Sequence, residues 1–100
     1  MRQALYDLVS QIPSGKVATY GELGRALPNP VSGLIVGRWM ASCPEGIPWW
    51  RVVAKSGELV LAKRGPIFAA DQEQRLRREG VAFVDGQVDV AKHLCEPLSP

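Results

Sequence analysis

The feature that most constrains the fold is a pair of short helical segments separated by a proline-rich turn. Thr19 stands three residues before Glu22, which is the capping-box pattern at the start of a helix. Pro28 and Pro30 end that helix at about residue 27, because proline lacks an amide hydrogen and disfavours helical geometry in the residue before it. A second helix is predicted over residues 31–41. A short helix, a tight turn and another helix have the spacing of a helix-turn-helix motif.

The helix predicted over residues 31–41 has two unlike sides. One side is an apolar stripe suited to a core, formed by Val31, Ile35, Val36, Trp39 and Met40. The opposite side carries Gly33, Leu34, Gly37, Arg38 and Ala41. A glycine inside a helix costs about 1 kcal/mol relative to alanine. A helix that keeps two glycines on its outer side is therefore expected to approach another surface closely.

The rest of the chain predicts more helix than strand. The predicted elements are a helix over 1–11, an extended piece at 16–18, a hairpin of 51–54 and 59–61 around Lys55-Ser56-Gly57, a helix over 69–79 closed by Gly80, and a hairpin of 81–84 and 87–90 around Asp85-Gly86. The fold class is therefore α+β and mostly helical, with a helix-turn-helix and small β-hairpins.

Length and charge indicate one globular domain with no strong charge bias. We expect a single domain over residues 1–100, with an irregular tail from about residue 91. The net charge of +2 is too small to indicate a polyanionic partner. A local excess of basic residues is more suggestive, because only one acid, Glu58, lies among them. These basic residues are Arg51, Lys55, Lys63 and Arg64, and the last three are candidate phosphate contacts.

Few residues could hold a metal or cross-link the chain. Cys43 and Cys95 lack the paired spacing of a zinc site, and His93 is the only histidine, so neither a metal nor a cofactor is expected. The sequence shows no leader, and no apolar run approaches the length of about 18 residues that a membrane helix needs. These patterns predict a cytoplasmic protein (nucleoid-associated, if bacterial) with free thiols and no membrane contact.

Two adjacent tryptophans, Trp49 and Trp50, stand between Pro48 and the apolar pair Val52-Val53. An indole is a flat apolar surface with one N–H donor, so it can pack or stack. It can neither attack an alkyl group nor take up a proton. If this segment is a site, we expect it to hold something rather than to transform it.

Together these motifs resemble the C-terminal domain of O6-alkylguanine-DNA alkyltransferases, and more closely the alkyltransferase-like proteins. The motifs are Gly15-Lys16-Val17-Ala18-Thr19-Tyr20-Gly21-Glu22-Leu23, Asn29-Pro30, Val36-Gly37, Met40, Pro48 to Val53, Ser56-Gly57 and Arg78-Glu79-Gly80. They cover the chain from its start to about residue 90. The resemblance implies a winged-helix-like DNA-binding domain.

The resemblance also implies that alkyl transfer is absent. In the enzymes the signature reads Pro-Cys-His-Arg-Val, and the cysteine accepts the alkyl group. That nucleophile position falls on Trp49, and the position of its activating histidine falls on Trp50. The glutamate that completes the enzymes' relay is placed on Glu73. Because a carboxylate cannot activate a missing nucleophile, the chain is not expected to be an enzyme. Alkyltransferase-like proteins also carry tryptophan at the cysteine position, commonly followed by histidine, so Trp50 departs from both groups.

For DNA, the resemblance implies a helix-turn-helix in the minor groove and a damaged base rotated into a protein pocket. The arginine that normally fills the vacated base stack falls on Leu34. We expect Leu34 to act as an apolar wedge and Arg38, one turn further on, to contact the DNA backbone. Tyr20 matches a tyrosine that turns the target phosphate. The implied DNA-binding residues are Thr19, Tyr20, Ser32, Gly33, Leu34, Gly37, Arg38 and Arg51.

The implied lesion pocket contains Tyr20, Trp49, Val52 and Glu73. Trp49 either lines this pocket and packs against the alkylated base, or plugs a cavity that chemistry once used. We expect Trp50 to pack as core beneath the pocket, and Arg51 to tie this segment to the recognition helix. Cys43 is expected to be a half-buried hinge residue.

The leading hypothesis is therefore a monomeric, noncatalytic sensor of O6-alkylguanine in double-stranded DNA that marks the lesion for the nucleotide excision repair machinery. One alternative is a residual alkyltransferase that uses a relocated thiol such as Cys43. A second is a helix-turn-helix DNA-binding regulator without lesion specificity. Against the regulator, the outer side of the 31–41 helix offers few groups that could read base edges in the major groove.

Overall fold

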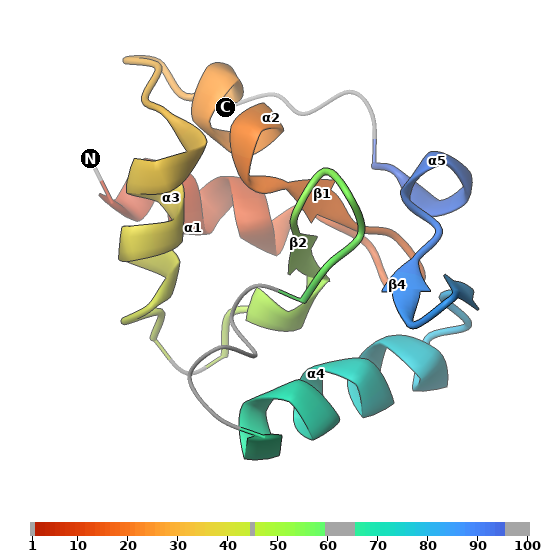
Figure 1. Ribbon diagram of the computed structural model, residues 1–100. Coiled ribbons are helices and arrows are strands. Elements are labelled where there is room, and N and C mark those ends of the chain that lie inside the picture. Colours follow the sequence, from red (N-terminus) through yellow and green to blue (C-terminus); the bar gives the residue numbers. More distant parts are fainter. Residues whose placement is uncertain (1, 45, 60–65, 96–100) are drawn as a thin grey trace.

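The structure is a computed structural model that describes residues 2–44, 46–59 and 66–95, with only the backbone described at 66–69 (Figure 1). The elements are α1 (Arg2–Ser10), β1 (Ala18–Thr19), α2 (Tyr20–Ala26), α3 (Gly33–Met40), the 3-10 turn η1 (Trp49–Arg51), β2 (Val52–Val53), α4 (Pro66–Arg78), β3 (Phe83–Val84), β4 (Gln87–Val88) and α5 (Val90–His93). Figure 1 shows α1, α2 and α3 on one side of the two central strands and α4 on the other. The predicted class, α+β and mostly helical, is confirmed.

The central strands divide the core into two clusters. β1 and β2 pair in parallel, with Ala18 opposite Val52 and Thr19 opposite Val53. Successive side chains of a strand point to opposite faces, so Val52 and Val53 enter different clusters. The first cluster lies among α1, α2 and α3 and contains Leu5, Leu8, Val9, Ile12, Leu23, Val36, Met40 and Val52. The second lies against α4 and contains Val17, Val53, Leu76, Val81 and Val88.

The two helices of the predicted helix-turn-helix begin at capped residues. The Thr19 hydroxyl accepts a hydrogen bond from the Glu22 amide at 3.3 Å, and the Ser32 hydroxyl accepts one from the Ile35 amide at the same distance. Each bond satisfies an amide that would otherwise lack a partner in the first helical turn. The Glu22 carboxylate accepts from the Thr19 hydroxyl at 2.9 Å, not from the Thr19 amide as a full capping box requires. The predicted start of α2 after Thr19 is therefore confirmed, through one of the two capping-box hydrogen bonds, while α3 begins at Gly33, two residues later than predicted.

Of the hairpin predicted around Lys55-Ser56-Gly57, the structure describes the first arm, which contains the two-residue strand β2, and the turn. β2 pairs with β1, which lies far away in the sequence, and Arg51 belongs to η1 rather than to a strand. A tight turn is present, since the Ala54 amide donates to the Glu58 carbonyl at 3.0 Å. Residues 60 and 61 of the predicted second arm lie outside the described residues, as do the candidate phosphate contacts Lys63 and Arg64.

The prediction for the end of α4 and for the following hairpin is confirmed. Gly80 has a positive φ of 86°, its amide donates to Arg77, and the Val81 amide donates to Leu76, which is a Schellman ending. β3 and β4 then pair antiparallel across Asp85 and Gly86, both with positive φ as a type I′ turn requires. α4 begins one turn earlier than predicted, at Pro66, because proline is tolerated at the first helical position.

The segment after β4 is ordered, so the irregular tail predicted from about residue 91 is wrong for residues 91–95. Asp89 caps α5 by accepting from the Lys92 amide, and Leu94 then forms a parallel bridge with Val17. The buried His93 ring accepts from the Ala82 amide through Nε2 and donates from Nδ1 to the Gly15 carbonyl, because a carbonyl can only accept. The C-terminal segment is thereby joined to the edge of the central sheet.

No helix among the described residues is long and apolar enough to cross a membrane.

Candidate nucleic-acid interface

The turn between α2 and α3 depends on a residue without a side chain. The Val31 amide donates to the Gly24 carbonyl at 3.1 Å, which closes the turn through Pro28 and Pro30. A Cβ at Gly24 would clash with the Val31 carbonyl oxygen, so a larger residue would force the two helices apart. Val36, fully buried, packs in the same place. Gly24 and the two prolines thus hold α3 at a defined angle to α2.

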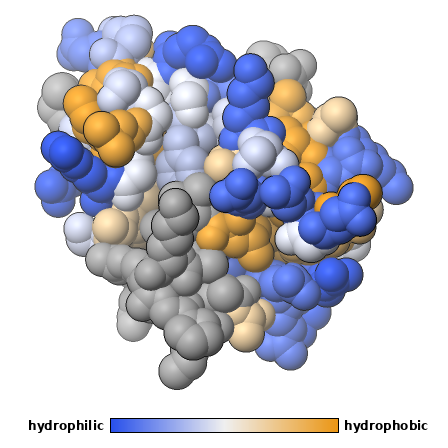
Figure 2. Space-filling model, viewed as in Figure 1, coloured by the Kyte–Doolittle hydropathy of each residue, from blue (hydrophilic) through white to orange (hydrophobic). Residues whose placement is uncertain are grey.

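The outward side of α3 presents an isolated apolar side chain. Leu34 is 70% exposed, which is unusual for a leucine, and Arg38 is exposed one turn further on. Nothing lies within 4 Å of the place where a Cβ at Gly37 would stand. Figure 2, drawn in the same view as Figure 1, shows an apolar area on the side of the molecule where α3 lies, with hydrophilic side chains beside it. The glycine-lined side predicted from the sequence is therefore open at Gly37.

Gly33 has a different reason for being glycine. A Cβ there would stand 3.2 Å from the Gly21 amide nitrogen, so the close approach at Gly33 is to α2 rather than to solvent. Ser32 and Thr19 likewise use their hydroxyls as helix caps. The predicted DNA contacts at these three residues remain predictions, and each residue has a role within the fold as well.

The tandem tryptophans point into different halves of the molecule. Their rings meet edge to face, with centroids 6.1 Å apart and planes at 87°. Trp49 is half-buried against the first core cluster, to which Tyr20 also belongs. Trp50 is half-buried against the second, so it packs against core as predicted, but against a different cluster from the predicted pocket residues. The two indoles therefore contact each other while packing against different core clusters.

The predicted pocket residues Tyr20, Trp49 and Val52 share the first cluster. Val52 is fully buried in β2. Tyr20 is 8% exposed, and burial raises the pKa of its phenol to about 12. Its hydroxyl oxygen is buried and has no hydrogen-bond partner among the described residues. Such a group is costly without a partner, and a ligand oxygen could supply one.

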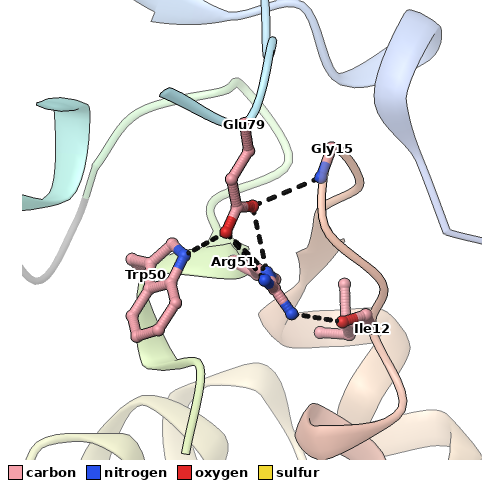
Figure 3. Close-up of polar contacts among 5 residues, drawn as sticks. All are labelled: Ile12, Gly15, Trp50, Arg51 and Glu79. Atoms are coloured by element: carbon pink, nitrogen blue, oxygen red, sulfur yellow. Dashed lines mark hydrogen bonds and ion pairs between the residues drawn. The ribbon is translucent and has the colours of Figure 1, made fainter. Parts of the chain in front are cut away.

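A carboxylate network holds the Trp50 segment in place (Figure 3). The Glu79 carboxylate accepts from Trp50 Nε1 at 2.9 Å, from the Gly15 amide at 3.2 Å and from Arg51 Nη2 at 2.7 Å. Arg51 Nη1 also donates to the Ile12 carbonyl at 2.7 Å. Burial raises the pKa of Glu79, but the hydrogen bonds from Arg51, Trp50 and Gly15 outweigh it, and the net pKa lies below the ordinary value.

This network corrects two expectations. The carboxylate that contacts Trp50 is Glu79, whereas Glu73 forms an exposed ion pair with Arg77 one helical turn away. The carboxylate partner of Trp50 is thus not Glu73, on which the resemblance placed the relay glutamate. Arg51 ties the segment to α1 and α4, not to the recognition helix α3, and its side chain is only 16% exposed.

Sequence reasoning missed Gln72, which also fixes this segment. Gln72 is fully buried in α4, and its amide nitrogen donates to the carbonyls of Trp50 and Val52, both at 3.1 Å. Its position four residues before the buried Leu76 was the available signal, because that spacing places both on one helix face. Arg75 adds a cation–π contact, 4.7 Å from the centre of the Trp50 ring.

The two thiols are weak candidates for chemistry. Both Cys43 and Cys95 are half-buried and free, and burial raises the pKa of each. A raised pKa lowers the thiolate fraction and so the reactivity. Cys43 packs against the first core cluster, as expected of a hinge residue. No group of three or more possible metal ligands occurs within residues 2–44, 46–59 and 66–95.

Residues 1–81 match the family model described as 6-O-methylguanine DNA methyltransferase, DNA binding domain. The chain is similar to a DNA base-flipping protein of Vibrio parahaemolyticus, with 32% identity over 93% of this chain and 93% of the relative. It is also similar to Alkyltransferase-like protein 1 of Schizosaccharomyces pombe, with 43% identity over 77% and 72%. A bifunctional methyltransferase/endonuclease of Thermoplasma volcanium is 40% identical over 84% of this chain, which spans only 26% of that protein.

A solved structure of S. pombe Atl1 in complex with damaged DNA containing O6-carboxymethylguanine has the same fold. The match has a TM-score of 0.76 and 27% identity, and it covers 96% of this chain and 94% of the other. The winged-helix-like, DNA-binding fold expected from the sequence is therefore confirmed, because this chain and the Atl1 structure share one fold.

Proposed function

The chain belongs to the family of the 6-O-methylguanine DNA methyltransferase DNA-binding domain, as an alkyltransferase-like member, and from this membership we propose that it is a noncatalytic sensor of O6-alkylguanine in double-stranded DNA. It acts as one domain and as a monomer. It enters the minor groove with α3, flips the damaged base into a pocket and marks the site for nucleotide excision repair.

The open side of α3 is the observation that carries this proposal. Leu34 stands 70% exposed beside the open surface of Gly37, with the exposed Arg38 one turn away. Minor-groove proteins frequently insert an apolar side chain between base steps, and small residues beside that side chain let the helix come close to the groove. In the proposed complex Leu34 is the wedge that fills the vacated stack, and Arg38 contacts a backbone phosphate.

The pocket for the flipped base is proposed on the side of the first core cluster. Trp49 offers an indole wall, and base–aromatic stacking is worth about 1–3 kcal/mol. The partnerless Tyr20 hydroxyl is close to the start of α2 and supports a role in binding a phosphate oxygen of the rotated nucleotide. Val52 supports the pocket from beneath. Glu73 is omitted from this proposed pocket, because it is paired with Arg77 on the surface of α4.

The absence of chemistry in this proposal follows from the residues at the reactive positions. Trp49 and Trp50 provide no nucleophile and no base, and Glu79 is already bound to the Trp50 indole and to Arg51. Burial of the Cys43 thiol argues against a relocated acceptor. A protein that binds an adduct without removing it leaves the lesion in place, so we propose that the bound complex is the mark that nucleotide excision repair reads.

The deciding experiment compares binding to two duplexes that are identical except for guanine or O6-methylguanine at one position, at one fixed salt concentration. We expect the modified duplex to bind at least about tenfold more tightly, a difference of about 1.4 kcal/mol. A preference below a few-fold, with discrimination among undamaged sequences, would instead support a helix-turn-helix regulator. Incubation with duplex carrying a radiolabelled O6-methyl group tests the other alternative, because label bound covalently to the protein would show a residual transferase.

A further inference from the structure

A hollow of about 420 Å³ lies beside the start of α2, outside the proposed base pocket. α2 forms one wall with Gly21, Glu22 and Arg25. Lys55, from the turn after β2, forms a second, and the C-terminal segment completes the hollow with Ala91 and other apolar side chains. Figure 1 shows α2, the loop after β2 and α5 around this region. The hollow therefore joins parts of the chain that are far apart in sequence.

The walls of the hollow differ in chemistry. Arg25 and Lys55 are exposed cations, while Val90, Ala91 and Leu94 give an apolar wall. The one acid, Glu22, accepts a hydrogen bond from the Thr19 hydroxyl at 2.9 Å, which partly satisfies its carboxylate. A cationic wall facing an apolar wall suits a ligand that is anionic along one edge and apolar along the other. The sugar–phosphate backbone of DNA has this composition, because charged phosphates alternate with deoxyribose rings.

The hollow is continuous with the helix that is proposed to enter DNA. Gly21 lines the hollow, and its amide nitrogen would be 3.2 Å from a Cβ at Gly33, the first residue of α3. The absence of a side chain at Gly21 also lets the Arg25 guanidinium lie close, since a Cβ there would be 3.3 Å from Arg25 Nη1. Arg25 therefore lies on α2 close to the start of α3.

We propose that this hollow is a second DNA-contact site, which binds the sugar–phosphate backbone beside the stretch contacted by α3. Arg25 and Lys55 each bind a phosphate, and the α5 side of the hollow packs against the intervening sugar. The proposal rests on the proposed DNA binding but not on lesion recognition. The C-terminal segment, beyond the residues 1–81 matched to the family domain, thereby becomes part of the DNA-binding surface.

The first test is the double variant Arg25→Gln/Lys55→Gln, measured on the guanine and the O6-methylguanine duplexes over a series of salt concentrations. Loss of two phosphate contacts should reduce the slope of log affinity against log salt by about 1.8, since each contact contributes about 0.9. We expect affinity for both duplexes to fall by the same factor, on the order of tenfold at 0.1 M salt. The control is Arg77→Gln/Arg78→Gln, which removes two exposed arginines from the last turn of α4, outside the hollow, and so matches the charge change.

The second test changes the sign of the charge in the wall itself. Ala91 is exposed on α5, so both Ala91→Lys and Ala91→Glu should fold, which thermal unfolding checks. Ala91→Lys should tighten DNA binding and Ala91→Glu should weaken it, each about threefold for one added phosphate-facing charge. Equal affinities for these two variants, or a double variant that matches its control, would overturn the second site. If the unmodified protein shows no preference for the O6-methylguanine duplex, the proposed lesion sensor is overturned. The salt slopes measured on the guanine duplex still test the hollow, because contacts to phosphates do not depend on the lesion.

Discussion

The outward side of α3 and the junction of η1 with α4 differ in how completely their groups are satisfied. At the junction, the Arg51 guanidinium and the Trp50 indole both donate hydrogen bonds to the Glu79 carboxylate. On α3, Leu34 faces solvent and Gly37 faces open space. The resemblance associates the junction with chemistry and α3 with DNA. In this chain the junction is a structural connection, whereas α3 still presents an exposed apolar side chain at Leu34.

The difference indicates where function and stability are located. A group whose hydrogen bonds are all made within the protein gains nothing from a ligand, whereas an exposed apolar side chain gains by becoming buried. We therefore expect substitutions at the junction to act on folding and substitutions on α3 to act on DNA binding. Four substitutions, at Glu79, Leu34 and Gly37, can break or sharpen this contrast.

Glu79→Ala should have the largest effect, a loss of about 3 kcal/mol in the free energy of unfolding, because it leaves the poorly exposed Arg51 without its counter-ion. Trp50 Nε1 and the Gly15 amide lose an acceptor as well. Urea unfolding measures the loss. Glu73→Ala is the control, since its ion pair with Arg77 is exposed and is worth about 0–1 kcal/mol. Similar losses for the two variants would contradict the assigned role of Glu79.

Acid titration tests whether the ionised form of Glu79 matters. Its pKa in the folded protein is lower than the ordinary value of 4.5, so its contribution to stability is complete above that value. The contribution is lost as the pH falls through the folded-state pKa. Glu79→Gln cannot show this loss, so its unfolding free energy should depend less on pH below 4.5 than that of the unmodified protein. Parallel curves for both proteins would show that the carboxylate is not preferentially ionised in the fold.

Leu34→Ala should weaken binding to O6-methylguanine duplex by about tenfold, or about 1.4 kcal/mol, because the wedge that fills the vacated stack is shortened. Stability should change by less than about 0.5 kcal/mol, since the side chain is 70% exposed. Equilibrium binding and urea unfolding give the two values. Val84→Ala is a matched control, because Val84 is also a large exposed apolar residue, at 56%, but lies on the β3–β4 hairpin. An unchanged affinity in Leu34→Ala would remove the wedge from the proposal.

Gly37→Ala should have the smallest effect and the opposite sign, raising the free energy of unfolding by about 0.5–1 kcal/mol. Its methyl group meets open space, so helix propensity alone decides the sign. DNA binding should weaken, because the added group separates α3 from the groove. Gly33→Ala is the comparison, since its Cβ would press on the Gly21 amide and should cancel the gain. If Gly37→Ala were both more stable and equally good at binding DNA, α3 would not approach DNA through this residue.

Local sequence signals predicted the elements that are stabilised locally. Thr19 begins a helix because its own hydroxyl caps it, and Gly80 ends one because it adopts a left-handed conformation. The order of the last segment could also have been predicted, since Asp89 is a typical capping residue. The parallel pairing of β2 with β1 could not, because a two-residue strand contains no signal for a partner so distant in the sequence.

In the candidate nucleic-acid interface, too, the sequence predicted local features but not contacts between distant segments. The open side of α3 followed from the 3.6-residue period of its glycines and apolar residues. The choice between Glu73 and Glu79 did not, because it depends on where the chain leaves α4 and on how η1 presents the Trp50 indole. Likewise, nothing near Arg25 in the sequence indicates that Lys55 and α5 enclose a hollow with it.

The bridge between Val17 and Leu94 has a consequence for how the protein is made. The sheet edge at Val17 stays unpaired until Leu94 and Cys95 arrive, and Cys95 donates its amide to the Val17 carbonyl at 2.8 Å. Contacts between such distant residues require closing a long loop, which slows folding. During synthesis, α1, α2 and α3 can pack as soon as they emerge, but the sheet can be completed only after residue 95 has left the ribosome.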